Sequence, residues 1–142
     1  MDYKRMEVYS LKKIFPYIAI ENCKEAVEYY RKLFGGEIKN VQLADGIEMF
    51  KGHEGKYIHA ELHISENSVL HFSDVFRGNH IIGNNILLLQ ELESEAEINR
   101  IYSSLSADGK VEMTLQDTFW GAKHAVVKDK NGILWELNYT KK

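Results

Sequence analysis

Three of the six histidines in this chain of 142 residues lie close together, between positions 59 and 71. His59, Glu61 and His63 alternate with aliphatic residues, which is typical of a β-strand with one polar and one apolar face. His71 follows after a short polar gap. Imidazole and carboxylate groups bind zinc, nickel and iron, but they also line polar cavities in which they hydrogen-bond one another or solvent. The pattern predicts a metal site or a polar ligand pocket, and we favour the pocket because these histidines span the strand face instead of surrounding one point.

The side to which His71 points depends on the loop between the two predicted strands. A three-residue loop at positions 66–68 pairs Leu62 with Phe72 and sets His63 opposite His71, which keeps the aliphatic side chains together. A two-residue loop would mix polar and apolar faces, and side-chain burial opposes such a slip. We therefore expect all four polar side chains on one concave face, with helices covering the aliphatic face.

The order of one strand, one helix and three strands occurs twice along the chain. In the first half, an apolar strand at 14–20 precedes a helix that Asn22 can cap, with Glu25 three residues later. In the second half, an apolar run at 85–92 precedes a helix that Ser94 can cap, again with an acid three residues on. The further strands are predicted at residues 37–44, 57–64, 68–75, 110–116, 124–129 and 133–139.

The two halves also correspond residue by residue at their ends. Residues 59–72, moved forward by about 65 positions, fall without a gap on the segment that begins at His124. His59 then coincides with His124, and His71 coincides with Glu136. Internal repetition of this kind fixes an architecture, because each half needs the other to bury its sheet.

The expected fold class is α+β, in one domain covering residues 1–142. Two paired βαβββ modules, about residues 14–76 and 84–140, would form a concave, partly closed mixed sheet with the helices outside. The sequence leaves open whether the modules pair within one chain or across a dimer.

Several segments resemble one known protein family. They are "PYIAIENCKEAVEYYRKLFGGEI", "HAELHIS", "VLHFSD" and "GKVEMTLQDTFWGAKHAVVKDKNGILWEL". From Phe15 to Tyr139 the chain resembles the PhnB-like branch of the vicinal-oxygen-chelate superfamily, which includes glyoxalase I, extradiol dioxygenases and bleomycin-resistance proteins. Its most specific pieces are "TFWG", which begins at Thr118, and "KDKNGILW". The resemblance implies the glyoxalase/bleomycin-resistance/dioxygenase fold and usually a homodimer.

In metal-dependent members of that superfamily, the ligands come from the first and last strands of each module. The last strands offer His71 and Glu136 here, and these two are candidates for a loosely held zinc, nickel, iron or manganese ion. The first strand of the first module offers Phe15, which cannot bind metal, and that of the second offers only Asn85, Ile86 or a neighbour. We therefore predict no cofactor and no tightly held metal with the full set of four ligands.

Two functions remain open. The first is a protein that binds a small molecule in a concave, dimer-associated cavity, with Trp120 stacking on the ligand. The alternative is a metal-dependent glyoxalase- or dioxygenase-like enzyme, in which Glu61 or Glu136 is a general base. The residues predicted to line the cavity are His59, Glu61, His63, His71, Trp120, His124 and Glu136.

The composition limits which partners and which cellular location we expect. The formal net charge of −3, without a basic run, gives no reason to expect nucleic acid or an anionic membrane as a partner. The polar first ten residues predict no signal peptide. The single Cys23 cannot form an intrachain disulfide, which favours a cytoplasmic location, and with no adjacent base it is not expected to be a nucleophile.

Overall fold

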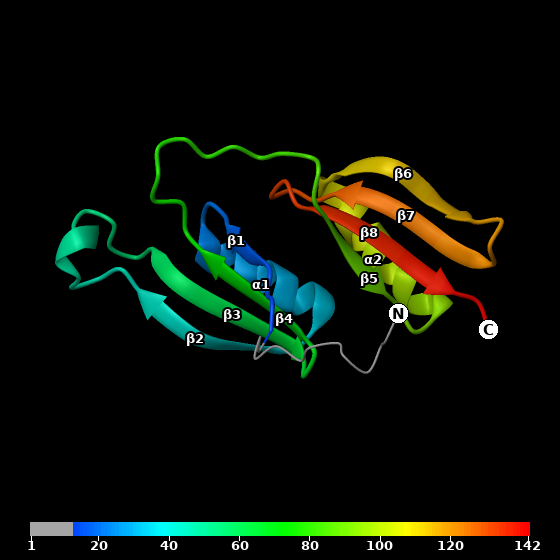
Figure 1. Cartoon of the computed structure of the whole chain (residues 1–142), viewed down its shortest axis with the longest axis horizontal. Coiled ribbons are helices and arrows are strands. Elements are labelled where there is room, and N and C mark those ends of the chain that lie inside the picture. Colours follow the sequence, from blue (N-terminus) through cyan, green and yellow to red (C-terminus); the bar gives the residue numbers. More distant parts are fainter. Residues whose placement is uncertain (1–12) are drawn as a thin grey trace, which may run out of the picture.

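The computed structural model describes residues 13–142, in which the strands form two separate four-stranded sheets (Figure 1). The first sheet has the order β1-β4-β3-β2 and contains β1 (Tyr17–Ala19), β2 (Glu37–Leu43), β3 (Tyr57–Ser65) and β4 (Ser68–Ser73). The second has the order β5-β8-β7-β6 and contains β5 (Leu87–Glu91), β6 (Lys110–Asp117), β7 (Ala122–Lys128) and β8 (Leu134–Thr140). The helices are α1 (Cys23–Phe34), α2 (Glu95–Asp108) and the short η2 (Glu48–Phe50).

The two sheets repeat one topology, so the expected α+β class of two βαβββ modules is confirmed. In each sheet the first strand runs parallel to the last, β1 to β4 and β5 to β8, and the other pairs are antiparallel. The register repeats as well: Glu61 lies opposite His71 in the first sheet, and Val126 lies opposite Glu136 in the second. The correspondence expected from the sequence therefore holds in the strand pairing.

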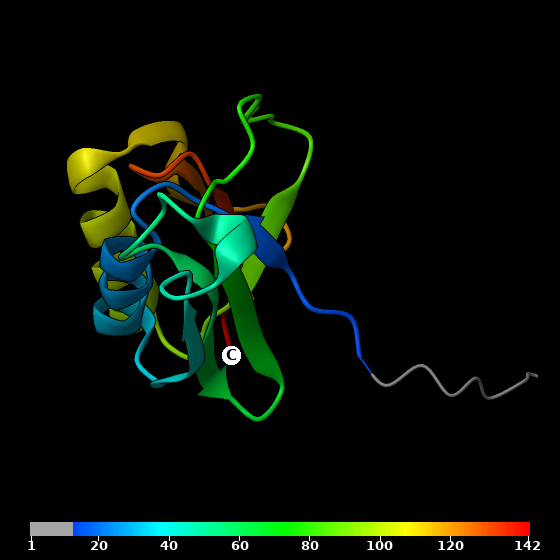
Figure 2. The same ribbon diagram turned by 90° about the vertical axis from the view of Figure 1, so that its left-hand side faces the viewer.

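The two α-helices, α1 and α2, lie on one side of the molecule and the strands on the other (Figure 2). Helix α1 covers the aliphatic face of the first sheet, where Tyr30 stacks on Phe72 with ring centroids 5.7 Å apart. Helix α2 covers the corresponding face of β7 and β8. No helix among residues 13–142 combines the length and apolar character needed to cross a membrane. The opposite face of each sheet is therefore free of helices, and the histidines of β3 and β4 lie there.

The expected cap of α1 is wrong. Asn22 adopts left-handed backbone angles, φ 53° and ψ 54°, and its side chain makes no capping hydrogen bond. The acceptor instead comes from the end of β4, where Asp74 Oδ1 accepts a hydrogen bond of 3.1 Å from the backbone N–H of Cys23. The cap of α2 is confirmed, because Ser94 Oγ accepts a bond of 3.1 Å from the N–H of Glu97.

The expected register between β3 and β4 is also wrong, although the expected face is right. The connection is a two-residue turn closed by the Ser65–Ser68 pair, with an irregularity before Ser65. As a result, His71 lies opposite Glu61, and His63 lies opposite Val69. The strands are offset by two residues from the expected pairing, and a shift of two leaves every side chain on its original face.

A buried carboxylate joins the two modules. Asp129, only 4% exposed, follows β7 and accepts hydrogen bonds from the phenol of Tyr30 at 2.5 Å and the indole of Trp135 at 2.8 Å. Backbone N–H groups of Asn131 and Ile133 donate to its other oxygen at 2.8 and 3.0 Å. Burial, reinforced by Asp129, raises the pKa of Tyr30 above its ordinary value, so the phenol stays a donor. Helix α1 of the first module is thus held against the second sheet.

We expect Asp129→Asn to lower the free energy of unfolding by about 3 kcal/mol, because an amide nitrogen replaces an oxygen that accepts from buried donors. Tyr30→Phe removes the bond to Asp129 and the longer one, 3.2 Å, that Asn131 Nδ2 donates to the phenol, and it should cost about half as much because Asp129 stays ionised and keeps its other donors. Asp108→Asn, at an exposed ion pair with Lys130, is the matched control and should change stability by less than about 0.5 kcal/mol. Urea unfolding measures all three, and equal effects of Asp129→Asn and Asp108→Asn would contradict the assignment.

Candidate functional site

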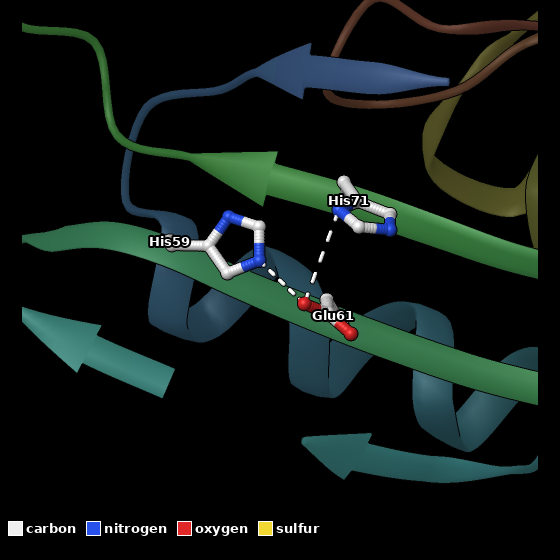
Figure 3. Close-up of side chains that lie close together, drawn as sticks. All are labelled: His59, Glu61 and His71. Carbon is white, nitrogen blue, oxygen red and sulfur yellow. Dashed lines mark hydrogen bonds and ion pairs between the residues drawn. The ribbon is translucent and has the colours of Figure 1, made fainter. Parts of the chain in front are cut away.

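The side chains of His59, Glu61 and His71 meet on the helix-free face of the first sheet (Figure 3). Two come from β3 and one from β4, and alternation along β3 places His63 on the same face. One ligand atom from each of the three lies within 4.8 Å of the others. All three side chains are largely but not fully enclosed. The structure therefore brings together the four polar side chains that the sequence singled out on these strands.

Glu61 is the centre of this group. Its Oε2 accepts from His59 Nε2 at 2.6 Å, and its Oε1 accepts from His63 Nε2 at 2.7 Å and from Asn40 Nδ2 at 3.0 Å. Burial by itself would raise the pKa of Glu61, but the hydrogen bonds from His59, His63 and Asn40 lower it to about 2. An ionised carboxylate only accepts hydrogen bonds, so both imidazoles carry a proton on Nε2.

Tyr17 completes the group, and sequence reasoning missed it. With the proton of His59 on Nε2, the phenol of Tyr17 donates to His59 Nδ1, at 2.8 Å. Tyr17 lies on β1 directly beside His71, so it occupies the first-strand position that had been assigned to Phe15. Phe15 packs against His71 instead, with ring centroids 4.6 Å apart. The two-residue spacing of Phe15 and Tyr17, which places both on one strand face, was the signal available in the sequence.

His71 is held by packing more than by hydrogen bonds. Its Nδ1 lies 4.0 Å from Glu61 Oε2, and its Nε2 is buried without a partner among residues 13–142. Burial lowers the pKa of His71, the carboxylate of Glu61 acts against it, and protonation of His59 or His63 would lower the pKa of His71 further. The neutral imidazole, with a free lone pair, is thereby favoured.

The second sheet carries a separate and smaller group. His124 Nε2 lies 3.3 Å from Glu136 Oε1, and the ring of Trp120 lies edge-on to His124 at 6.0 Å. Trp120 is 56% exposed. Within residues 13–142, no ion pair or hydrogen bond joins this group to the one on β3 and β4, and the three-ligand group does not include Glu136. A single cavity lined by all seven residues, with metal held by His71 and Glu136, stays a prediction.

A cavity of about 820 Å³ lies between the two modules, and it is lined by none of those seven residues. Its walls include β4 and β5 together with side chains of both helices. They combine apolar side chains, among them Phe15, Phe34, Val69, Leu70, Leu87, Leu88, Ile101 and Trp135, with polar and charged ones, among them Lys13, Glu66, Gln90, Glu91, Glu97 and Arg100. It adjoins the histidine group through Phe15, which contacts His71, and through Val69, which pairs with His63. The sequence did not reveal this space because it depends on how the modules dock.

Cys23 is fully buried at the start of α1. Burial, with a contribution from the nearby Asp74 carboxylate, raises the pKa of the thiol to about 12. A thiol with so high a pKa is a poor nucleophile at neutral pH.

The model of the Glyoxalase/Bleomycin resistance protein/Dioxygenase superfamily matches residues 13–137, and the chain belongs to this superfamily. Protein YjdN of Escherichia coli (strain K12) is 27% identical over 141 residues, which cover 89% of this chain and 94% of that protein. The crystal structure of PA1353 from Pseudomonas aeruginosa has a TM-score of 0.80 and 27% identity, and covers 93% of this chain and 100% of that one.

A PhnB protein from Bacillus cereus, described as a putative 3-demethylubiquinone-9 3-methyltransferase, has a TM-score of 0.79 and 26% identity. That comparison covers 91% of this chain and 100% of the other. Together with PA1353 and YjdN, it confirms the expected PhnB-like branch.

The metal site that the superfamily implies, with one ligand from the first and last strand of each module, does not fit this chain. Beside Glu136 on the first strand of the second sheet lies Leu89, which has no donor atom. The positions expected there, Asn85 and Ile86, precede β5. Phe15, which precedes β1, offers no ligand, and Tyr17 on β1 is engaged with His59. Two of the four strands therefore supply no free ligand.

We expect the His71 imidazole to titrate below the ordinary value of about 6.5, because burial disfavours its charged form. In Glu61→Gln the pKa should fall further, since the carboxylate is the group that opposes the decrease. A depressed imidazole pKa stabilises the fold above about pH 6.5, and this contribution is lost as the pH falls through the folded-state pKa. Side-chain NMR titration, with His71→Gln to assign the signal, measures both values. A higher pKa in Glu61→Gln would contradict the geometry.

Proposed function

We propose that this chain binds a small organic molecule whose apolar part occupies the cavity between the modules and whose polar part faces the histidines of β3 and β4. The observation that carries the proposal is the cavity of about 820 Å³, which lies within the range of about 300–1,000 Å³ usual for ligand sites. Its wall supplies apolar surface together with polar side chains such as Gln90 and Arg100, and ligand sites usually combine these two kinds of group.

The polar group beside the cavity supports recognition of a hydrogen-bonding ligand. Tyr17 is 56% exposed, so its hydroxyl oxygen can accept from a bound molecule while it donates to His59. The neutral ring of His71 offers a further acceptor or donor beside Phe15. An aromatic compound with hydroxyl or carboxyl substituents would match both the stacking surfaces and the polar groups.

A second copy of the chain is the partner that this proposal includes. Large apolar side chains are exposed on and near the second sheet: Ile86 is 74% exposed, Leu89 57%, Phe119 97% and Trp120 56%. Exposed apolar side chains of this kind support an interface there. The repeated module and its open strand edges also favour closure by a twofold partner, which would place the cavity next to the interface.

The enzyme alternative is favoured by one observation, the three-ligand group on β3 and β4. The methyltransferase description of the Bacillus cereus relative is not carried over, because the sequence contains no Gly-rich strand-turn-helix segment of the kind that binds nucleotide-like cofactors. Binding without a defined reaction is therefore the function we propose.

The cavity can be tested with the dye 8-anilinonaphthalene-1-sulfonate, which carries aromatic rings and an anionic group. The wild type should bind it saturably, and Leu87→Trp, which places a larger side chain on the cavity wall, should weaken binding roughly tenfold or more. Leu43→Trp, at a similarly exposed position on β2, is the matched control and should bind as the wild type does. Fluorescence titration measures this, with circular dichroism to verify folding, and equal binding by both variants would reject the cavity as the site.

The assembly can be tested by light scattering at micromolar concentration, where we expect twice the mass of one chain. Leu89→Asp should produce a monomer, because it places a charge on an apolar contact surface. Lys32→Asp, on the exposed side of α1, should leave the mass unchanged. A wild-type chain that is a stable monomer at this concentration would remove the dimer from the proposal.

A further inference from the structure

We propose that His59, Glu61 and His71 form a binding site for one divalent transition-metal ion. The site lies within the first module, on β3 and β4, and it takes no ligand from β1 or from the second sheet (Figure 3). This inference goes beyond the proposed binding of a small molecule and does not require it. It also differs from the four-strand arrangement, which the residues of this chain do not fit.

The spacing of the ligand atoms suits an ion. A metal about 2.0–2.2 Å from imidazole nitrogen and carboxylate oxygen needs ligand atoms roughly 3–3.5 Å apart. Glu61 Oε2 lies 2.6 Å from His59 Nε2 and 4.0 Å from His71 Nδ1, so the observed distances fall on either side of that value. Small rotations of the side chains would therefore open one contact and close the other around an ion.

The surrounding hydrogen bonds orient two of the three ligands. Glu61 Oε1 is occupied by Asn40 and His63, which leaves Oε2 directed at His59 and His71. His59 Nδ1 is held by Tyr17, which leaves its Nε2 directed at the carboxylate. If the metal binds Nε2 of His59, the proton of that imidazole moves to Nδ1. The Tyr17 oxygen can then accept a hydrogen bond from Nδ1–H, because a phenol both donates and accepts hydrogen bonds. Metal-binding imidazoles and carboxylates are usually oriented by such partners.

The third ligand, His71, makes no hydrogen bond among residues 13–142 that would compete with a metal ion. Nε2 of His71 is buried without a hydrogen-bond partner among residues 13–142, and its Nδ1 is beyond hydrogen-bond distance of Glu61. Phe15 packs on the ring and fixes its plane. A buried imidazole without a polar partner is an unusual arrangement, and a metal ion on Nδ1, the nitrogen that faces Glu61, would give the ring a polar interaction although Nε2 stays unpartnered.

Two imidazoles and one carboxylate favour zinc, cobalt, nickel or ferrous iron over calcium or magnesium, which prefer oxygen ligands alone. The ligand side chains are partly exposed, His59 by 24%, His71 by 16% and Glu61 by 12%, so a fourth position faces solvent. Three protein ligands with an open position can accept a water molecule or an oxygen atom of a bound compound. The site would then anchor the polar end of a ligand.

The second module shows why the site exists only once among the described residues. At the corresponding positions, His59 becomes His124 and His71 becomes Glu136, but Glu61 becomes Val126. The central carboxylate is thus absent, and only two ligand groups remain. The two sheets share a backbone register, so the difference lies in side-chain chemistry alone.

The test uses the full chain without a histidine tag, stripped with EDTA and freed of the chelator, in the absence of any organic ligand. Co²⁺ is titrated and followed by its visible absorption, and Zn²⁺ binding is measured by calorimetry. We expect one equivalent of each, and at least roughly tenfold weaker binding in His59→Ala, Glu61→Gln and His71→Ala. Tyr17→Phe should weaken binding by about tenfold through the orientation of His59. His80→Ala, at a histidine outside the group, should bind as the wild type does.

Glu61→Gln is nearly isosteric, so it keeps the test valid if an alanine variant fails to fold, as circular dichroism would show. Saturable one-to-one binding that is lost in the ligand variants and kept in His80→Ala supports the site. No saturable binding by the wild type, or equal binding by wild type and Glu61→Gln, overturns it, the latter as adventitious binding only. Neither result depends on the dye titration, so failure of the metal site and failure of the cavity are distinguishable.

Discussion

The carboxylate of Asp129 is the interaction on which the arrangement of the two modules depends. An enclosed carboxylate is tolerated only when its lone pairs receive donors, and here they receive four. Tyr30 is the donor from α1 of the first module, whereas Trp135 and the backbone of the turn belong to the second. No strand of one sheet pairs with a strand of the other within residues 13–142. The modules are thus joined by a buried polar contact, by the aromatic packing around it and by the hydrogen bond of 3.0 Å that Arg100 of α2 donates to the carbonyl of Leu33.

That contact also explains why apolar packing and polar chemistry are separated in this fold. Phe34 packs edge-on against Trp135 at 4.9 Å, beside the Tyr30–Asp129 bond, so both helices are gathered on one side of the two sheets. The same aromatic side chains form part of the cavity wall. The opposite face of the first sheet is free of helices, and its polar side chains need no apolar partner. Docking of the modules therefore creates the cavity and leaves the histidine face accessible beside it.

Much of the fold could be predicted from the sequence. Strand alternation is visible within a short segment, and the internal repeat is visible when the chain is compared with itself. The repeat predicted two corresponding modules, and alternation predicted the shared face of His59 and His71. The offset between β3 and β4 could not be predicted, because an irregularity before Ser65 changes the pairing without changing the face. Tyr17 was missed because a parallel neighbour on β1 comes from a distant segment whose register is set by tertiary contacts.

The two modules repeat the same backbone arrangement but carry different side chains, and this difference bears on function. Corresponding positions carry Glu61 and Val126, or His63 and Lys128, while the neighbouring first strands carry Tyr17 and Leu89. The first sheet thus presents one connected polar group, whereas the second has only the smaller pair of His124 and Glu136 beside the apolar Leu89. In the proposed binding mode, a compound that lies in the cavity and reaches the polar group beside it would contact hydrocarbon at one end and hydrogen-bonding groups at the other, so it would be held in one orientation. Two equal modules would suit a symmetric ligand or the same ligand twice, whereas two unequal ones would suit a molecule with one polar and one apolar end.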